Sequence, residues 1–440
     1  MTLFPSARTG GFKVGARLSR RMNPGDRVRV ARAGQVNEGV LLPSSTPENV
    51  VVKLDSGYNV GVDREDADVE VLESDVYAVD AAAGAESDET GASTVAFDED
   101  LPTVSLISTG GTIASTVDYR TGAVTARFDA EDVLRAVPDL AGRANYRGRV
   151  VANILSENMD PSIWQDLARA VHEEVEAGAD GVVVMHGTDT MQYTASALSF
   201  MLDAPVPVVF TGSQRSADRP SSDNVVNAVC AVEAATADVA EVLVCMHATQ
   251  SDDRCALHRA TRVRKAHTSR RDAFETVGGT PVGHVDYATG EVTFDADADL
   301  AARGERELSV RPDLDSDVEL VQFTPGMDAA FFDLLEGANG VVVAGTGLGH
   351  VRSDLVDVIC DLTAGGTTVV MTSQCLGGRV CDRVYDTGRD LLDAGVVEGE
   401  DMLPGTATVK LMWVLANAES TAEAMRTSLA GELTARSVPE

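Results

Sequence analysis

The pattern of hydrophobic and polar positions changes twice along this chain. Residues 22 to about 75 contain short runs of alternating apolar and polar residues between turn-forming residues, as in "DRVRVAR" and "ENVVVKLDSGYNVGV". Alternation with a period of two is typical of half-buried strands, and several short strands in succession predict a small all-β barrel of the SH3 or OB type. Residues 76–100 are rich in alanine, glycine, serine and acidic side chains, which predicts a solvated linker.

From residue 101 onward, apolar runs alternate with segments of helical periodicity. Strands are expected at 104–107, 181–185, 207–210 and 242–246, helices at 162–177 and 191–202, and a second set of strands at 318–323, 340–343 and 367–371. Nearly continuous apolar strands that alternate with helices are typical of a parallel sheet covered on both faces. We therefore predict an α/β fold with a larger domain over 101–305 and a smaller one over 315–435.

The charge of the chain is unusual for a folded protein. Its 440 residues include 69 acidic and 36 basic residues, a formal net charge of −33, and only four of the basic residues are lysines. An acidic, lysine-poor surface suggests adaptation to concentrated salt, where repulsion is screened and net charge maintains solubility. Acidity as a binding surface for a basic partner is the alternative. This charge argues against a chain that alone grips nucleic acid over most of its surface.

The N-terminus and the cysteines bear on location. Residues 1–21 carry five basic and no acidic side chains but lack the apolar segment of a secretory signal. We interpret them either as a disordered arm or as a stretch upstream of a true start at Met22. No apolar run is long enough to predict a membrane-spanning helix. The six cysteines include no CxxC pair, which suits a reducing cytoplasm and argues against a disulfide framework or a metal site.

Two predicted strands end in similar polar turns. "VSLISTGGTIA" places Ser108–Thr112 at the carboxyl end of a strand, where chemistry gathers in parallel α/β sheets. It lacks the lysine and spacing of a Walker loop, which leaves a plain glycine turn or a catalytic threonine. "GVVVMHGTDTM" has the same form and places Thr188 and Asp189 before a helix, where capping alone would explain one of them.

A threonine hydroxyl is a weak nucleophile and needs a neighbouring base. Lys265, in "TRVRKAHTSRRDAF", is one of only four lysines in a chain that otherwise uses arginine. A partly buried lysine can lose its proton, whereas an arginine cannot, and Asp189 could hold that ammonium. A surface lysine is the competing interpretation.

Three other motifs do not change this picture. "GTGLGH" at 345–350 imitates a dinucleotide fingerprint, but without a ribose-binding acid we interpret it as a turn near a subunit contact. His186 and His267 lack metal-ligand spacing and are expected to pack or to form hydrogen bonds. The two cysteines of "SQCLGGRVCD" are interpreted as structural.

"STGGTIAS", "HGTDTM" with its downstream lysine, and "GSQRSADRPSSDNVVNAV" resemble the bacterial-type L-asparaginases and glutaminase-asparaginases over residues 101–430. The "MNPGDRVRV" barrel, "VRKAHTSRRDAF" and the C-terminal "TSQCLGGRVCDRVYDTGRDLLDAGVVEGEDMLP" resemble, within that group, the archaeal glutamyl-tRNA(Gln) amidotransferase D subunits. The acidic composition suits a salt-loving archaeon. The resemblance implies a two-domain asparaginase-like α/β core after a small all-β barrel.

The resemblance also implies roles for individual residues. Thr112 matches the nucleophile that forms an acyl-enzyme with a side-chain amide, while Tyr119 matches the loop residue that activates it. Thr188, Asp189 and Lys265 match the group that orients water and moves protons.

The remaining implied residues bind the substrate. Ser156 and Glu157 match the pair that holds the α-carboxylate and α-amino group of the amino acid; many asparaginases carry Gln in place of Glu157, but a carboxylate also suits an ammonium. The backbone N–H groups around Gly111–Thr112 and Thr188–Asp189 would stabilise the oxyanion.

The implied function is the glutaminase component of a tRNA-dependent amidotransferase. Glutamine would be hydrolysed at Thr112, and ammonia would pass to the E subunit of the amidotransferase, which uses ATP and Mg²⁺ to convert Glu-tRNA(Gln) to Gln-tRNA(Gln). This chain would bind no cofactor or metal itself, and its homodimer would form the core of a two-plus-two assembly that binds tRNA(Gln). A free-standing L-asparaginase and a non-catalytic protein that binds an amino acid or tRNA are the alternatives.

Overall fold

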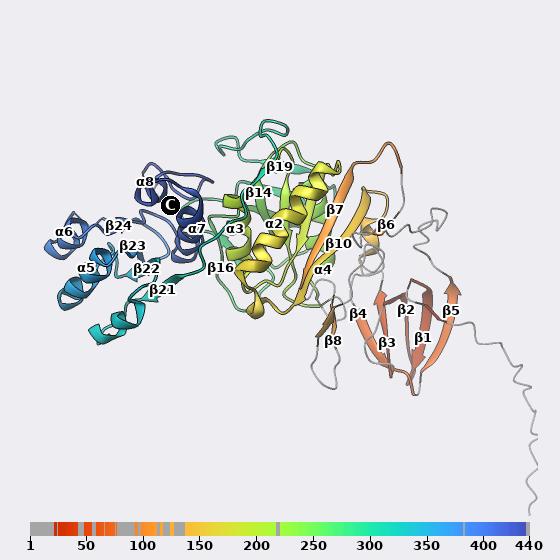
Figure 1. Ribbon diagram of the computed structural model, residues 1–440. Helices are drawn as coiled ribbons and strands as arrows, with labels where there is room; N and C mark the ends of the chain where they lie inside the picture. The colour runs from red at the N-terminus through yellow and green to blue at the C-terminus, as the bar shows by residue number, and fades with distance from the viewer. Residues whose placement is uncertain are drawn as a thin grey trace, which may run out of the picture.

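The computed structural model shows three parts that follow one another along the chain (Figure 1). The structure describes residues 22–23, 25–42, 48–54, 59–65, 67–74, 76, 93–95, 98–111, 115–117, 124–126, 137–216, 221–381 and 383–436. The arm expected over 1–21 and most of the linker expected over 76–100 lie outside these residues.

The first part, which we call the β domain, is a five-stranded antiparallel sheet in the order β4-β3-β2-β1-β5. Its strands are β1 (Arg27–Arg32), β2 (Gln35–Leu42), β3 (Asn49–Leu54), β4 (Asn59–Asp63) and β5 (Asp68–Glu73). Val28, Val30 and Val52 are fully buried in its small core. The predicted strands are present, but the described residues include no pairing of β4 with β5, so the sheet is not seen to close into the expected barrel.

The β domain contacts the central domain through one of the four lysines. Lys53 Nζ, on β3, lies 2.9 Å from Asp139 Oδ2 on the short helix η1 (Pro138–Leu140). Between the two domains, β6 (Ser93–Val95) pairs with the edge of the central sheet. The central fold therefore begins within the segment that composition assigned to the linker, because three residues of pairing leave little compositional signal.

A nine-stranded sheet forms the central domain, in the order β19-β18-β15-β14-β13-β11-β7-β10-β6. Its longer strands are β7 (Thr103–Gly110), β10 (Asn145–Ile154), β11 (Gly181–Met185), β13 (Val208–Thr211), β14 (Val242–His247), β15 (Arg254–Arg259), β18 (Gly283–Asp286) and β19 (Val292–Phe294). The five neighbouring strands β14, β13, β11, β7 and β10 are parallel, as predicted.

The sheet is mixed rather than wholly parallel. Strand β15 returns antiparallel to β14, and β18 and β19 continue in the same manner. The chain between β14 and β15 spans only residues 248–253, which is too short for the crossover that a parallel neighbour requires.

Helices cover both faces of the sheet, because alternate residues of a strand point to opposite sides. Helices α2 (Pro161–Glu176) and α3 (Met191–Met201) pack over Val182 and Val184 of β11. Helix α4 (Asn224–Ala235) packs over Val183 and Met185 on the other face.

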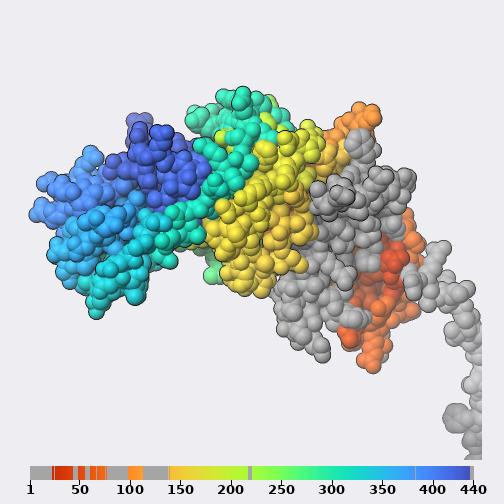
Figure 2. All heavy atoms as spheres, in the orientation of Figure 1, coloured from red at the N-terminus to blue at the C-terminus, as the bar shows by residue number. Residues whose placement is uncertain are grey.

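The C-terminal domain contains a parallel sheet in the order β21-β22-β23-β24. Its elements are β21 (Val318–Gln322), η3 (Ala329–Leu335), β22 (Gly340–Gly345), η4 (Ser353–Leu355), α5 (Val356–Ala364), β23 (Thr368–Ser373), α6 (Asp386–Asp393), β24 (Val397–Glu398), α7 (Pro404–Asn417) and α8 (Thr421–Arg426). Helix α7 packs against both β22 and α3, and so joins the two domains into one core. On the side that faces the viewer in Figure 2, the two domains form a continuous surface.

Three two-stranded ribbons complete the described elements: β8 (Ser115–Val117) with β9 (Val124–Ala126), β12 (Leu202–Asp203) with β20 (Ser309–Val310), and β16 (Val263–Lys265) with β17 (Phe274–Thr276). No helix in the described ranges is long and apolar enough to cross a membrane.

Candidate active site

The carboxyl ends of three neighbouring strands meet at one edge of the central sheet. Strand β7 lies between β10 and β11, with Ser108 opposite Met185 and Gly110 opposite Ile154. Since all three strands are parallel, the residues that follow them emerge side by side. Gly111, Ser156 and the Gly187–Asp189 segment therefore gather in one place.

Two glycines allow these three segments to approach each other closely. A Cβ on Gly111 would lie 2.7 Å from the Gly187 N atom, and Gly111 also has φ +92°, a conformation that other residues rarely adopt. A Cβ on Gly187 would lie 2.6 Å from the Ser156 Cβ. The glycines of "STGGT" and "HGTDT" thus permit backbone contact, which explains why both strand ends use the same residue type.

A charged cluster lies on this edge. Lys265 Nζ donates to Thr188 Oγ1 at 2.8 Å and to Asp189 Oδ1 at 2.7 Å. Thr188 is 8% exposed and the Lys265 side chain 11%, whereas the Asp189 side chain is 67% exposed. The ammonium is therefore enclosed, and the carboxylate opens to solvent beside it.

The contact with Lys265 leaves the Thr188 hydroxyl with a proton to donate. Its oxygen accepts a hydrogen bond from the ammonium, and no acceptor for its own hydrogen is found among the described residues. A threonine in this state can orient a water molecule or a second hydroxyl, while the adjacent amine receives or returns a proton.

Lys265 reaches the cluster from a distant part of the chain. It is the last residue of β16, and its backbone N–H donates to Gln192 Oε1, in the first turn of α3, at 2.9 Å. Gln192 could not be recognised from the sequence, because a glutamine at the start of an apolar helix carries no signal until the fold places β16 beside it.

Ser156 completes the described cluster. It begins the short helix η2 (Ser156–Asn158), and its Oγ lies 3.4 Å from Asp189 Oδ2 in a long hydrogen bond. Thr190 Oγ1 donates to the Ser156 carbonyl at 2.8 Å, which fixes this turn against the one after β11. Glu157 follows Ser156 and is exposed at the same edge.

The two histidines have the structural roles that the sequence suggested. The His186 ring is buried, and its Nδ1 lies 2.7 Å from the Gly187 carbonyl oxygen. Burial lowers the pKa of His186 to about 4, so the ring is neutral near pH 7. His267 Nδ1 accepts hydrogen bonds from the backbone N–H groups of Ser269 and Arg270. In the described ranges, no group of three or more His, Cys, Asp or Glu side chains is placed to hold a metal ion.

Six of the eight predicted site residues fall within the described part of the chain, and they converge on this edge. Thr112 and Tyr119 lie outside the described residues. In the sequence, Thr112 directly follows Gly111, which is the last described residue before the gap at 112–114 and lies against the Gly187 backbone.

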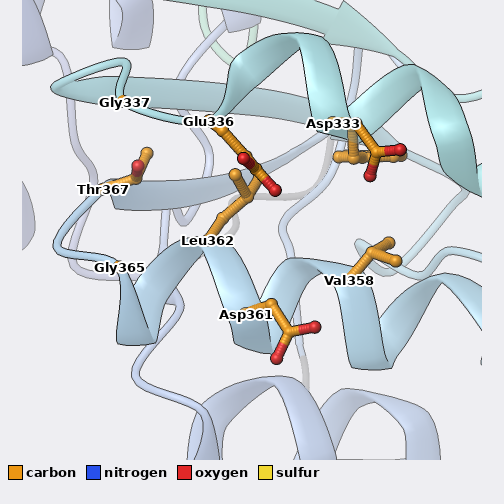
Figure 3. Close-up of a pocket in the computed structure, with 9 residues that line it drawn as sticks. Asp333, Glu336, Gly337, Val358, Asp361, Leu362, Gly365 and Thr367 are labelled. Carbon is orange, nitrogen blue, oxygen red and sulfur yellow. The ribbon is translucent and has the colours of Figure 1, made fainter.

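A separate cavity of about 360 Å³ lies in the C-terminal domain, between η3 and α5 (Figure 3). Three carboxylates line it, Asp333, Glu336 and Asp361, together with apolar side chains such as Leu362. It shares no residue with the cluster around Lys265. We place the chemistry at the strand ends, because an ammonium, a hydroxyl and a carboxylate are in contact there.

The comparisons with known proteins identify the class of fold. The family models "Asparaginase, N-terminal" and "Glutaminase/Asparaginase C-terminal domain" match residues 103–299 and 317–427. The thermostable L-asparaginase from Thermococcus kodakarensis is 32% identical, with a TM-score of 0.68, covering 76% of this chain and 99% of that chain. L-asparaginase I from Vibrio cholerae is 27% identical, with a TM-score of 0.65 and coverage of 76% and 99%. The fold and the strand-end cluster define an asparaginase-like protein.

The β domain narrows this class. The model of the GatD N-terminal domain matches residues 22–72. The glutamyl-tRNA(Gln) amidotransferase D subunit of Halobacterium salinarum is 70% identical over 95% of this chain and 99% of its own length. Those of Haloquadratum walsbyi and Methanosarcina acetivorans are 66% and 51% identical, with coverage of 95% and 93% of this chain and 99% and 98% of their own lengths. This chain belongs to the family of glutamyl-tRNA(Gln) amidotransferase D subunits.

Proposed function

We propose that this chain is the glutamine-hydrolysing subunit of a tRNA-dependent amidotransferase. The contact of Lys265 with Thr188 and Asp189 carries the proposal, because it joins an amine, a hydroxyl and a carboxylate at the strand end where Thr112 follows Gly111. The family membership supplies the reaction: ammonia from glutamine is transferred to the glutamate of Glu-tRNA(Gln).

In this mechanism, the Thr112 Oγ bonds to the side-chain amide carbon of glutamine, and backbone N–H groups near Gly111 and Thr188 stabilise the resulting oxyanion. The carbon–nitrogen bond then breaks, and the nitrogen leaves as ammonia after it accepts a proton. Thr188 orients a water molecule that attacks the acyl carbon, and Lys265 moves the proton. Glutamate leaves and the Thr112 hydroxyl is restored.

The other proposed residues bind the substrate or activate the nucleophile. Ser156 and Glu157 would hold the α-carboxylate and α-ammonium groups, with exposed Asp189 beside them as a further acceptor for an ammonium. Tyr119 would assist proton removal from Thr112.

The assembly and the location also belong to this proposal. We propose that a partner, the E subunit of the amidotransferase, accepts the ammonia, uses ATP and Mg²⁺ and binds tRNA(Gln). Two copies of each protein would assemble around a homodimer of this chain in the cytoplasm. No cofactor or metal would be bound by this chain itself.

Replacement of Thr112 by Val tests the nucleophile, since the two side chains have nearly the same shape. We expect Thr112→Val to abolish ammonia release from glutamine, while transamidation with added ammonium continues. Thr109→Val is the matched control, because within the described ranges the Thr109 hydroxyl makes only a long, 3.4 Å hydrogen bond to the Met185 carbonyl. Near-normal glutamine hydrolysis by Thr112→Val would refute the assignment.

Partner dependence distinguishes this function from a free-standing asparaginase. Glutamine and asparagine hydrolysis would be measured for the full-length chain and for a chain that lacks residues 1–76, each with and without partner and Glu-tRNA(Gln). We expect stimulation of glutamine hydrolysis in the complex, and a loss of part of that stimulation without the β domain. Brisk asparagine hydrolysis that neither partner nor tRNA changes would favour the asparaginase.

A further inference from the structure

The C-terminal domain holds the residues that precede the strand of Lys265. Thr261 Oγ1 donates to the Ala430 carbonyl at 2.9 Å, and Thr406 Oγ1, at the start of α7, donates to the Thr261 carbonyl at 3.1 Å. The β16 strand begins two residues later, at Val263. One end of this short ribbon is therefore fixed to a domain that provides none of the groups around Thr188.

Arg262 makes the strongest of these contacts. Its guanidinium lies 2.8 Å from Asp401 Oδ2 through Nη2, and it donates at 3.3 Å to the carbonyls of Asp401 and Gly431 through Nη1 and Nε. The side chains of Arg262 and Asp401 are each 7% exposed. A buried, charge-assisted pair with several hydrogen bonds fixes the geometry of both partners, because the loss of either one leaves a buried charge.

Asp401 is held in turn by the C-terminal segment. It accepts hydrogen bonds from the backbone N–H and the hydroxyl of Thr434. Although burial raises the pKa of the Asp401 carboxyl, the hydrogen bonds from Thr434 and Arg262 keep that pKa below its ordinary value. The carboxylate therefore remains charged opposite Arg262.

A second buried ion pair anchors the same segment. Lys410 Nζ, on α7, lies 2.6 Å from Glu432 Oε1, and both side chains are fully buried. Glu432 also accepts hydrogen bonds from the backbone N–H groups of Leu429 and Ala430. The carbonyl groups that receive Thr261 and Arg262 are thus fixed to α7, which itself packs on α3.

These contacts place a rigid support three residues before the catalytic amine. Lys265 is held on its other side by the hydrogen bond from its N–H to Gln192 of α3. We infer that Arg262 is a positioning residue: its ion pair with Asp401 sets the distance from Lys265 Nζ to Thr188 and Asp189. This inference rests on the proposed function, since it assigns Arg262 an effect only through Lys265.

If the Arg262–Asp401 ion pair were merely structural, its loss would lower the stability of the fold and leave kcat unchanged. A positioning role has a different result, because a displacement of about 1 Å at a catalytic group can cost about 10²-fold in rate. We expect Arg262→Met to lower kcat for glutamine hydrolysis by about 10- to 100-fold with little change in KM, since Ser156 and Glu157 are untouched. Arg262→Lys keeps the charge without the planar fork and should show a smaller loss of kcat.

The deciding experiment is a kinetic double-mutant cycle on the full-length chain, assayed in the presence of its partner. Arg262→Met, Arg262→Lys, Lys265→Met and the two double variants are compared by rate of ammonia release and by melting temperature. We expect the Arg262 changes to have no further effect on kcat once Lys265 is methionine. Arg306→Met is the matched control, because Arg306 also pairs with a buried carboxylate, Glu241, at 3.1 Å, and among the described residues no hydrogen bond or ion pair joins it to the Lys265 ribbon.

The outcomes separate this inference from the proposed function. Equal fold-losses of kcat from an Arg262 change in the wild-type and Lys265→Met backgrounds would overturn the positioning role. So would an equal loss of kcat in Arg306→Met at the same fall in melting temperature. Full activity of Lys265→Met would instead refute the role of Lys265 in the proposed function, and the inference with it. If Arg262→Met does not fold, Arg262→Lys provides the same cycle.

Discussion

Strands β11 and β22 are both buried and are bordered on each side by a parallel strand. A glycine–threonine pair lies near the end of each, Gly187–Thr188 after β11 and Gly345–Thr346 at the end of β22. After β11, the chain enters α3 and leaves Thr188 buried under Lys265. After β22, the exposed Thr346 donates through both its N–H and its hydroxyl to the His350 carbonyl, at 2.8 and 3.1 Å. In the turn after β11, the threonine hydroxyl is bonded by a lysine from the β16–β17 ribbon. In the turn after β22, the threonine hydroxyl is bonded within the turn itself.

The difference shows that a position at the end of a parallel strand is not sufficient to make a hydroxyl catalytic. A hydroxyl at such a position becomes useful when a distant element brings it a charged partner. β16 provides that partner for β11 through Lys265, whereas the hydroxyl of Thr346 is already bonded within its own turn.

The largest expected difference follows from Thr→Val at both ends. Thr188→Val removes the hydroxyl that receives Lys265, so hydrolysis of glutamine should fall by about 10²- to 10⁴-fold, the usual contribution of an acid–base step. Thr346→Val removes a hydroxyl whose one bond among the described residues lies within its own turn, and its rate should stay within about two-fold of wild type. Ammonia release at saturating glutamine measures both. Equal losses at the two positions would remove the distinction between these strand ends.

The amine is tested by Lys265→Arg. If Lys265 moves a proton, arginine should be nearly as damaging as alanine, about 10²- to 10⁴-fold, because a guanidinium keeps its charge at any working pH. The backbone bond to Gln192 does not depend on the side chain, so the ribbon should keep its place. Substantial activity of the arginine variant would reduce Lys265 to an electrostatic role.

The buried strands and several residues at their ends could be predicted from the sequence. Buried strands such as Gly181–Met185 have an unbroken apolar run, and the repeated glycine–threonine turns placed Thr188 and Asp189 correctly at a strand end. Lys265 was found because lysine is rare in this chain. These signals are local, or they depend on composition, and both survive in a single sequence.

The rest could not be predicted because it depends on contacts between distant segments. Gln192 and Lys265 are separated by 73 residues, and Arg262 and Asp401 by 139. The antiparallel half of the central sheet was missed because strands such as β18 and β19 are short and carry few apolar residues. In an acidic chain, neither an arginine nor an aspartate is distinctive enough to indicate its partner.

A smaller effect is expected from two glycine substitutions, one at Gly111, which follows β7 and lies against Gly187 beyond β11, and one at Gly347, which lies beyond β22. In Gly111→Ala the new Cβ would meet the Gly187 backbone at 2.7 Å, and the residue would be held at positive φ. Strain and overpacking together should cost about 2–5 kcal/mol of stability. Gly347 also has a positive φ, +22°, but its new Cβ meets no atom within 4 Å, so Gly347→Ala adds no overpacking and should cost about 1–2 kcal/mol. Urea unfolding at constant molar KCl measures both, and similar losses would contradict the close backbone contact at the site.

The smallest effect is expected in the pH dependence of the free energy of unfolding. It depends on the histidine near each turn, His186 after β11 and His350 after β22. His186 has a pKa of about 4 in the folded chain because burial disfavours its charged form, against an ordinary value of 6.5. Between these two values the unfolded chain binds a proton that the folded chain does not. Stability must therefore fall as the pH is lowered from about 6.5 toward 4, and a shift of this size corresponds to about 2 kcal/mol lost by pH 5. His350 is partly exposed, and burial lowers its pKa as well.

His186→Asn isolates this contribution, because an asparagine amide can still donate to the Gly187 carbonyl but does not titrate. The free energy of unfolding would be measured in urea at pH 7 and pH 5 with KCl held constant, for wild type, His186→Asn and His350→Asn. The fall in the free energy of unfolding between the two pH values should be smaller by about 2 kcal/mol in His186→Asn than in wild type.

Other buried histidines, such as His258, are common to all three proteins and cancel in the difference. His350→Asn should retain most of the wild-type fall, since its ring keeps contact with water and aqueous solvation favours the charged form. An equal reduction in both variants would mean that the His186 ring, which lies near Phe210, is no more enclosed than the His350 ring, which stacks edge to face with Tyr385.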